Sequence, residues 1–191
     1  MRHTSIISLI LLLLSLLFGL SFTGCGYQGN GIVKVERREV GSFNSLLVEQ
    51  ESGGTGPVIG QNEYSGFRIK LIQDTVEYTT IEYDENLLHH IKTESVNGKL
   101  IIRSRKSLLS KRDIHVNVHY INLEHIDATS FAEIIFATPY HGSRLGMDLT
   151  GASDIKGEVF ADVLDIDVSG AADLNLKGKA QIGRASCRER V

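Results

Sequence analysis

Apolar and polar residues alternate in short runs along the chain after residue 31, whereas the spacings of an amphipathic helix are rare. These runs are rich in Val, Ile, Thr and Tyr, and turn residues such as Asn97-Gly98, which suit a tight hairpin, separate them. One helical turn is predicted at 84–91, where Leu87, Leu88 and Ile91 can face inward. We therefore expect an all-β protein with strands at 32–35, 45–48, 67–72, 79–83, 99–103 and 114–119.

A near-repeat of eight residues occurs three times in the last third of the chain. DATSFAEI begins at Asp127, DLTGASDI at Asp148 and DVSGAADL at Asp167, so the copies start 21 and 19 residues apart. This spacing is the length of one coil of a β-solenoid. The copies are therefore predicted to stack as successive rungs.

Each rung has an inner and an outer face, because alternate side chains of a strand point to opposite sides. The three repeated residues Asp127, Asp148 and Asp167 are expected to project outward. The aliphatic residues between them are expected to share one interior, namely Ile126, Ala128, Leu145, Met147, Leu149, Leu164, Ile166 and Val168.

The repeat also predicts a structural corner after each strand. Gly151 and Gly170 are expected where the chain turns onto its next face, because positive φ is cheap only for glycine. Asp154 and Asp173 are expected to bond the backbone of their own corner. Ser130 stands in the glycine place of the first copy, which predicts a looser corner there.

The stacked acids allow a functional interpretation beside the structural one. Carboxylates on neighbouring strands, about 4.8 Å apart, could bind calcium or act as the paired acids of a polysaccharide-cleaving enzyme that uses Asp148, Asp167 or Asp154. Like charges at that spacing repel each other least when solvent and salt screen them. This favours the structural interpretation, in which the stacked carboxylates are exposed and solvated.

The histidines do not change this interpretation. His115 and His119 lie about 13 Å apart on one strand face, too far to share a metal ion. We therefore predict no catalytic, cofactor-binding or metal-binding residue and no enzymatic activity.

The N-terminus predicts export and a lipid anchor. A basic start, a short apolar run and Phe22-Thr23-Gly24 before Cys25 are typical of a signal peptide, assigned to residues 1–24. Cys25 resembles the acylated cysteine of the bacterial lipobox, and residues 25–31 are expected to be a tether. Gly26 is not the acidic residue associated with inner-membrane retention, so we expect a cell-envelope protein anchored in the outer membrane.

The C-terminal residues 182–191 (IGRASCRERV) resemble a translated sequencing adapter and break the strand pattern. We expect that they are not native and that the domain at 32–181 lacks its last rungs. With Cys25 acylated and Cys187 excluded, neither a disulfide nor a thiol nucleophile is expected. The net charge of −3 disfavours nucleic acid as a partner.

Several segments together resemble the head GIN domain family of auto-transporter adhesins, common in lipoproteins of Bacteroidetes-type bacteria. They are FNSLLV (43–48), FRIKLIQ (67–73), IEYDENLLHHI (81–91), NGKLII (97–102) and the repeated corners. The resemblance covers 43–181, implies a right-handed single-stranded parallel β-helix, and transfers no catalytic residue.

From these patterns we expect a non-catalytic, lipid-anchored protein for adhesion or envelope recognition, with polysaccharide or an envelope protein as partner. The alternatives are a carbohydrate-active enzyme, a calcium-dependent glycan binder and a structural spacer without a ligand.

Overall fold

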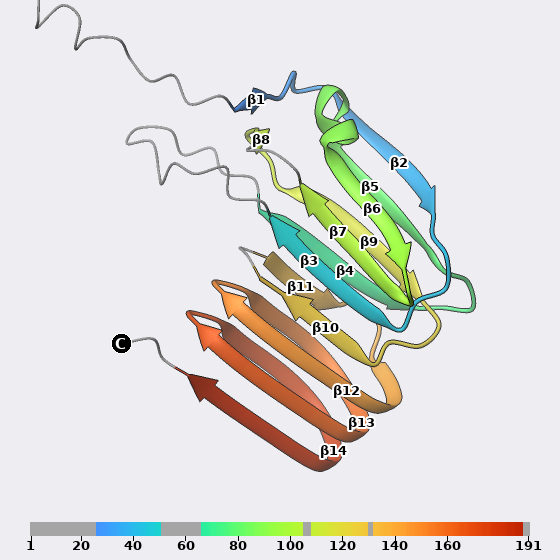
Figure 1. Ribbon diagram of the computed structural model, residues 1–191, viewed down its shortest axis with the longest axis vertical. Coiled ribbons are helices and arrows are strands. Elements are labelled where there is room, and N and C mark those ends of the chain that lie inside the picture. The colour runs from blue at the N-terminus through green and yellow to red at the C-terminus, as the bar shows by residue number, and fades with distance from the viewer. Residues whose placement is uncertain (1–25, 51–65, 105–107, 130–131, 189–191) are drawn as a thin grey trace, which may run out of the picture.

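The computed structural model describes residues 26–50, 66–104, 108–129 and 132–188. Almost all of their regular structure is β, as expected, with one 3-10 helix (Figure 1). The elements are β1 (Tyr27–Gln28), β2 (Val33–Glu39), β3 (Ser45–Gln50), β4 (Phe67–Gln73), β5 (Tyr78–Asp84), η1 (Glu85–His90), β6 (Ile91–Val96), β7 (Lys99–Ser104), β8 (Leu108–Leu109), β9 (Ile114–Tyr120), β10 (His125–Ala128), β11 (Ala132–Phe136), β12 (Tyr140–Gly151), β13 (Asp154–Gly170) and β14 (Asp173–Arg188).

One large mixed sheet contains all strands except β1 and β8, and it curls back on itself (Figure 1). Its strand order is β2-β5-β9-β4-β11-β13-β12-β10-β3-β7-β6, with β14 also on β13. Strand β13 joins the two halves, because residues 154–156 pair with β11 and residues 159–170 pair with β12. We call the β6-β7-β3-β10-β12 half, together with residues 159–170 of β13, the front layer. The β2-β5-β9-β4-β11 half, together with residues 154–156 of β13, is the back layer.

The predicted stacking of the repeats is confirmed. Asp127 pairs in parallel register with Asp148, and Asp148 with Asp167, so the three copies occupy successive rungs of the front layer. In the back layer the same coils align Ile134 with Ile155. The spacings of 21 and 19 residues in the sequence are therefore the lengths of the coils.

The hydrophobic core lies between the two layers. The front layer contributes the aligned residues Leu46, Leu100, Ile126 and Met147, and the back layer contributes Ile69, Val116, Ile134 and Ile155, all 0% exposed. Burial of each large aliphatic side chain contributes about 1.5–3 kcal/mol, which makes this core the main source of stability.

The inward positions predicted from the repeat also face this core. Two of them, Leu164 and Ile166, are only partly buried against it. The buried ones are Ile126, Ala128, Leu145, Met147, Leu149 and Val168.

The sheet is not parallel throughout residues 32–181, which corrects the expectation of a purely parallel helix. Strands β2, β5 and β9 are antiparallel neighbours in the back layer, and β6 and β7 are antiparallel in the front layer. The β6–β7 reversal follows from its turn, where Asn97 and Gly98 have φ values of 52° and 76°. These antiparallel strands cap one end of the stacked coils.

The rungs do not follow chain order at this end. Strand β3 lies between β7 and β10, and β4 lies between β9 and β11. Strands β3 and β4 therefore lie in the middle of the stack. Strands β7 and β9 flank them on one side, and β10 and β11, which come later in the sequence, flank them on the other.

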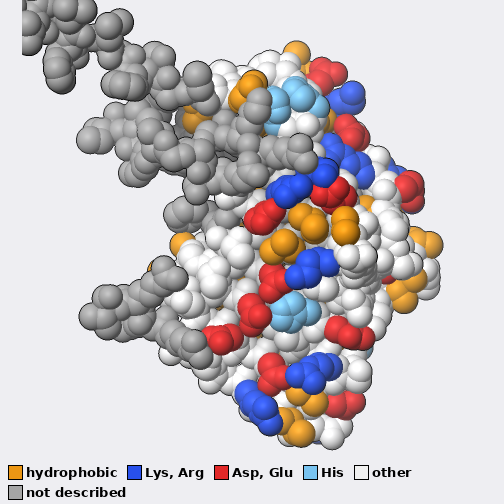
Figure 2. Space-filling model, viewed as in Figure 1, with side chains coloured by type: hydrophobic (Ala, Val, Ile, Leu, Met, Phe, Trp, Pro, Cys, Tyr) orange, Lys and Arg blue, Asp and Glu red, His pale blue; other side chains and the backbone are white. Residues whose placement is uncertain are grey.

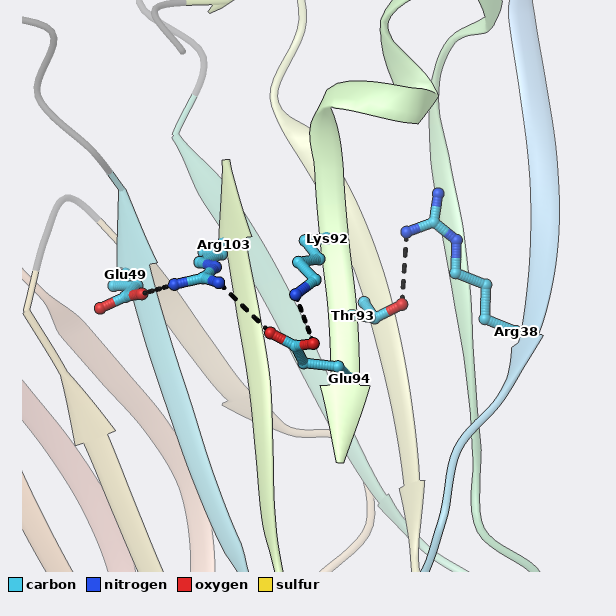
Figure 3. A network of polar contacts seen from close by, with 6 residues as sticks. All are labelled: Arg38, Glu49, Lys92, Thr93, Glu94 and Arg103. Atoms are coloured by element: carbon cyan, nitrogen blue, oxygen red, sulfur yellow. Dashed lines mark hydrogen bonds and ion pairs between the residues drawn. The ribbon is translucent and has the colours of Figure 1, made fainter. Parts of the chain in front are cut away.

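A polar network crosses the capped end (Figure 3). Arg103 on β7 donates to Glu49 on β3 and to Glu94 on β6, each at 3.3 Å. Lys92 forms an ion pair with Glu94. Arg38 on β2 reaches the Thr93 hydroxyl at 3.2 Å, so the last strands of both layers are linked.

The corner glycines take the backbone conformation that motivated their assignment. Gly151 has φ 97° and Gly170 has φ 119°, and the two are paired in register. Asp154 and Asp173 are paired neighbours on the next strands. Ser130 lies outside the described residues.

The two ends of the chain are the segments for which the sequence predicts a signal peptide, a lipid anchor and an adapter. Residues 1–24 and Cys25 lie outside the described residues. The expected tether includes β1, which pairs in parallel with β8. Strand β14 continues through residues 182–188 in register with β13, and the assignment of 182–191 to an adapter stays a prediction. Among the described residues, no helix has the length and apolar character needed to span a membrane.

Candidate functional site

The outer surface of the front layer carries a charged strip across consecutive rungs. Asp127, Asp148 and Asp167 occupy one outward column of β10, β12 and β13, because they are register partners at alternating positions. Acidic, basic and histidine side chains gather along this face in Figure 2. This strip is the candidate functional site.

His125 connects two of these acids. Its Nε2 lies 2.9 Å from Asp127 Oδ1 and 3.4 Å from Asp148 Oδ2. Lys99 Nζ donates to the other oxygen of Asp127, Oδ2, at 2.7 Å. We call Lys99, His125, Asp127 and Asp148 the His125 cluster.

The imidazole of His125 lies over a glycine on the next rung. His125 is the register partner of Gly146, and Gly146 is buried beneath it. A Cβ placed on Gly146 would lie 2.7 Å from His125 Nδ1, closer than such atoms pack. The missing side chain therefore allows the ring to reach Asp148.

The charge state of Asp127 follows from its neighbours. Burial raises the pKa of this carboxyl group, but hydrogen bonds and charges from Lys99 and His125 lower it by more, so the net pKa is below its ordinary value. Asp127 is therefore ionised at neutral pH and cannot donate a proton there.

A shallow groove of about 340 Å³ runs beside the His125 cluster toward the later rungs. It is lined in part by His125, Arg144, Asp148, Asp165 and Asp167. Arg144 and Asp165 form an exposed ion pair at 2.9 Å within it. The groove therefore presents both charge signs to a partner.

Asp154, the third acid of the enzyme hypothesis, lies on the other layer. It lines a small hollow of about 140 Å³ beside Arg68, Asp113 and Glu133. Arg68 pairs with Asp113 at 3.0 Å and with Glu133 at 3.1 Å. The outer faces of the two layers point away from each other, so Asp154 cannot share a substrate with Asp148.

Sequence reasoning missed His125 and Lys99 as members of the site. The His125-x-Asp127 spacing, which places both side chains on one strand face, was the available signal for the histidine. No local signal identifies Lys99, because its contact depends on β7 and β10 both lying beside β3.

Solved structures of other proteins share this fold. An adhesin described as putative from Parabacteroides merdae aligns with a TM-score of 0.64 and 18% identity over 81% of this chain and 60% of its own. Another adhesin described as putative, from Bacteroides fragilis, aligns with a TM-score of 0.69 and 17% identity, over 86% of this chain and 72% of its own. A protein described as a putative lipid binding protein from Parabacteroides distasonis aligns with a TM-score of 0.64 and 18% identity, over 85% of this chain and 64% of its own.

The chain thus spans 60% of the length of the first of these proteins. A search of curated proteins found no match to the chain. Residues 63–189 match the family described as "Putative auto-transporter adhesin, head GIN domain".

Proposed function

Because the chain belongs to the head GIN domain family of auto-transporter adhesins, we propose that it is an exported, lipid-anchored protein for non-catalytic adhesion or envelope recognition. The observation that carries the proposal is the regular outer face of the front layer. Its outward positions repeat from β10 to β12 to β13 along one groove. Such a regular surface suits an extended partner, a polysaccharide or an envelope protein.

The charged side chains of this face are held in place before a partner arrives. Lys99 is fixed to Asp127, and Arg144 to Asp165, at hydrogen-bond distance. Ordered polar groups lose less conformational entropy on binding than free ones. This arrangement supports selective recognition of hydroxyl and amide groups on a repeating chain.

The same site supports binding better than hydrolysis. A glycosidase needs one carboxyl group whose pKa is raised so that it can donate a proton. At this site Asp127 has a lowered pKa, the opposite of what a proton donor needs. One observation still supports the enzyme alternative: a carboxylate oxygen of Asp127 lies within 4.8 Å of a carboxylate oxygen of Asp148.

The proposed lipid anchor places acyl chains on Cys25, at the outer membrane, with the solenoid standing off the lipid. The apolar run before the cysteine supports this proposal. A labelled fatty acid supplied during expression would mark the wild-type protein. Cys25→Ser is expected to lose the label and to leave the membrane fraction, whereas unchanged labelling would contradict the anchor.

We extend the proposal to the geometry of the later rungs, as a right-handed, single-stranded β-helix. The parallel pairing of β12, β13 and β14 over most of their lengths supports it. A crystal structure that gave the coils the opposite hand would refute this part.

The binding proposal is tested with purified envelope polysaccharides. We expect saturable binding without release of reducing ends. The double variant Lys99→Glu and Arg144→Glu on the front layer should weaken it at least tenfold, whereas Lys156→Glu on the back layer should not. Steady release of reducing ends would favour the enzyme alternative. Equal effects of front and back variants, or no bound polysaccharide or envelope protein, would contradict recognition by this face.

A further inference from the structure

We propose that His125, Asp127 and Asp148 form a binding site for one divalent transition-metal ion of the Zn²⁺ type on the outer face of the front layer. The three side chains come from the adjacent strands β10 and β12. Their ligand atoms all lie within 4.8 Å of one another.

The spacing of the donors suits a small ion. Zn²⁺ binds nitrogen and carboxylate oxygen at about 2.0–2.1 Å with tetrahedral geometry, which sets donor atoms about 3.3–3.4 Å apart. The Nε2 of His125 lies 2.9 Å from Asp127 Oδ1 and 3.4 Å from Asp148 Oδ2. These two distances lie within about half an ångström of that separation. The third pair, the donor oxygens of Asp127 and Asp148, lies within 4.8 Å and would close around the ion.

The donor types also select the class of metal. Imidazole with carboxylates suits Zn²⁺ and its transition-metal neighbours, whereas Ca²⁺ and Mg²⁺ prefer sets made of oxygen alone. The site thus differs from the calcium ladder considered from the sequence, because a nitrogen donor lies between the two acids.

Gly146 supplies an independent structural argument. It has no positive φ that would require glycine, yet a Cβ there would lie 2.7 Å from His125 Nδ1. Its small size is therefore needed for the position of the imidazole ring and not for the backbone. That position is what brings Nε2 to Asp148 on the next rung.

Lys99 holds one ligand in orientation without occupying the donor atom. It binds Asp127 Oδ2 at 2.7 Å and leaves Oδ1 directed at His125. Groups that bind the far side of a ligand in this way typically change metal affinity 10–100-fold.

The metal-free cluster keeps a proton where the ion would bind. Both carboxylates are acceptors, so the Nε2 between them carries the hydrogen. On metal binding the neutral imidazole would bind the ion through Nε2 and carry its proton on Nδ1. A fourth position would remain for water or for an oxygen of a partner in the groove.

Calorimetric titration of Zn²⁺ into EDTA-treated protein without a histidine tag tests the site. A Cys187→Ser background removes the exposed thiol, a competing ligand. We expect one saturable site, with Co²⁺ giving the visible absorption of a low-coordinate complex. His125→Ala and Asp148→Asn should each weaken binding at least tenfold. Gly146→Ala should weaken it about tenfold although it removes no donor.

Two variants provide matched controls. His119→Ala removes another histidine bound to an acid, since its Nδ1 lies 2.9 Å from Asp74 Oδ2 in the back layer. Asp167→Asn removes the next acid of the same column. Both should bind Zn²⁺ as the parent does. Absence of saturable binding to the parent, or full affinity in His125→Ala or Asp148→Asn, would overturn the proposal. The exposed position of Asp148 keeps that variant informative even where Gly146→Ala fails to fold.

Discussion

The Arg38 guanidinium donates a 2.6 Å hydrogen bond to the carbonyl oxygen of Ile91, 53 residues away in the sequence. A second bond of 3.0 Å goes to the carbonyl oxygen of Leu88 in η1. Arg38 lies on the outermost strand of the back layer, and Ile91 begins the outermost strand of the front layer. One side chain therefore closes the capped end between the two layers.

Replacement of Arg38 by Met should lower the free energy of unfolding by about 2–3 kcal/mol, because hydrogen bonds to charged groups are strong and two carbonyl oxygens lose their donor. Arg37→Met is the matched control on the same strand, where an exposed ion pair with Glu39 and a cation–π contact with Tyr78 are expected to contribute less. Urea unfolding followed by circular dichroism measures both. Equal midpoints for the two variants would contradict this account.

Substitution at a corner glycine should be costly. Gly170 has φ 119°, and a Cβ there would lie 2.5 Å from the carbonyl oxygen of Gly151 on the previous rung. We expect Gly170→Ala to destabilise the protein by about 1–3 kcal/mol. Gly41→Ala is the control, because its Cβ would meet Ser95 Cβ at an ordinary 3.6 Å. A thermal midpoint that falls equally in both variants would refute the corner argument.

The Lys99–Asp127 pair predicts a pH dependence of stability. The folded pKa of Asp127 lies below its unfolded value of about 3.9, so its contribution is present above that pH and is lost as pH falls through the folded pKa. Asp127→Asn should therefore be less stable than wild type at pH 7, by no more than about 1 kcal/mol after solvent screening.

Urea unfolding of both proteins in EDTA, repeated from pH 7 down to about pH 2.5, measures this difference. The two free energies should begin to converge as the pH falls below about 4, and should meet only below the folded pKa of Asp127. A constant difference over the whole range would show that the carboxylate charge is not responsible.

Truncation in the core should expose the role of the aligned aliphatic residues. Ile134 is 0% exposed between Ile69 and Ile155 of neighbouring strands, so Ile134→Ala should cost about 2–5 kcal/mol. Ile121, which is 51% exposed, is the control and should change stability by less than about 0.5 kcal/mol. Similar losses from both substitutions would contradict the position of the core.

Local patterns predicted much of the fold, because alternation and coil length are properties of short segments. The six expected strands, the turn at 84–91 and the stacking of Asp127, Asp148 and Asp167 are all present. Strand β6 was missed, since the polar residues Lys92 and Glu94 interrupt its apolar pattern.

The antiparallel cap and the order of the coils were not predictable in this way. They depend on which sheet edge the chain joins after each turn, which no residue pattern states. For the same reason, only part of the candidate site could be predicted from the sequence. The column of acids follows from the repeat, whereas the link of Lys99 to Asp127 requires β3 to lie between β7 and β10.

The central position of β3 and β4 has a consequence for how the chain assembles. These strands precede their neighbours in the sequence but need β7 and β9 on one side and β10 and β11 on the other. Assembly is therefore bidirectional, with β3 and β4 serving as a template that has two open edges. Such nonlocal closure is slow, so the newly made chain has an interval in which both edges can capture a foreign strand.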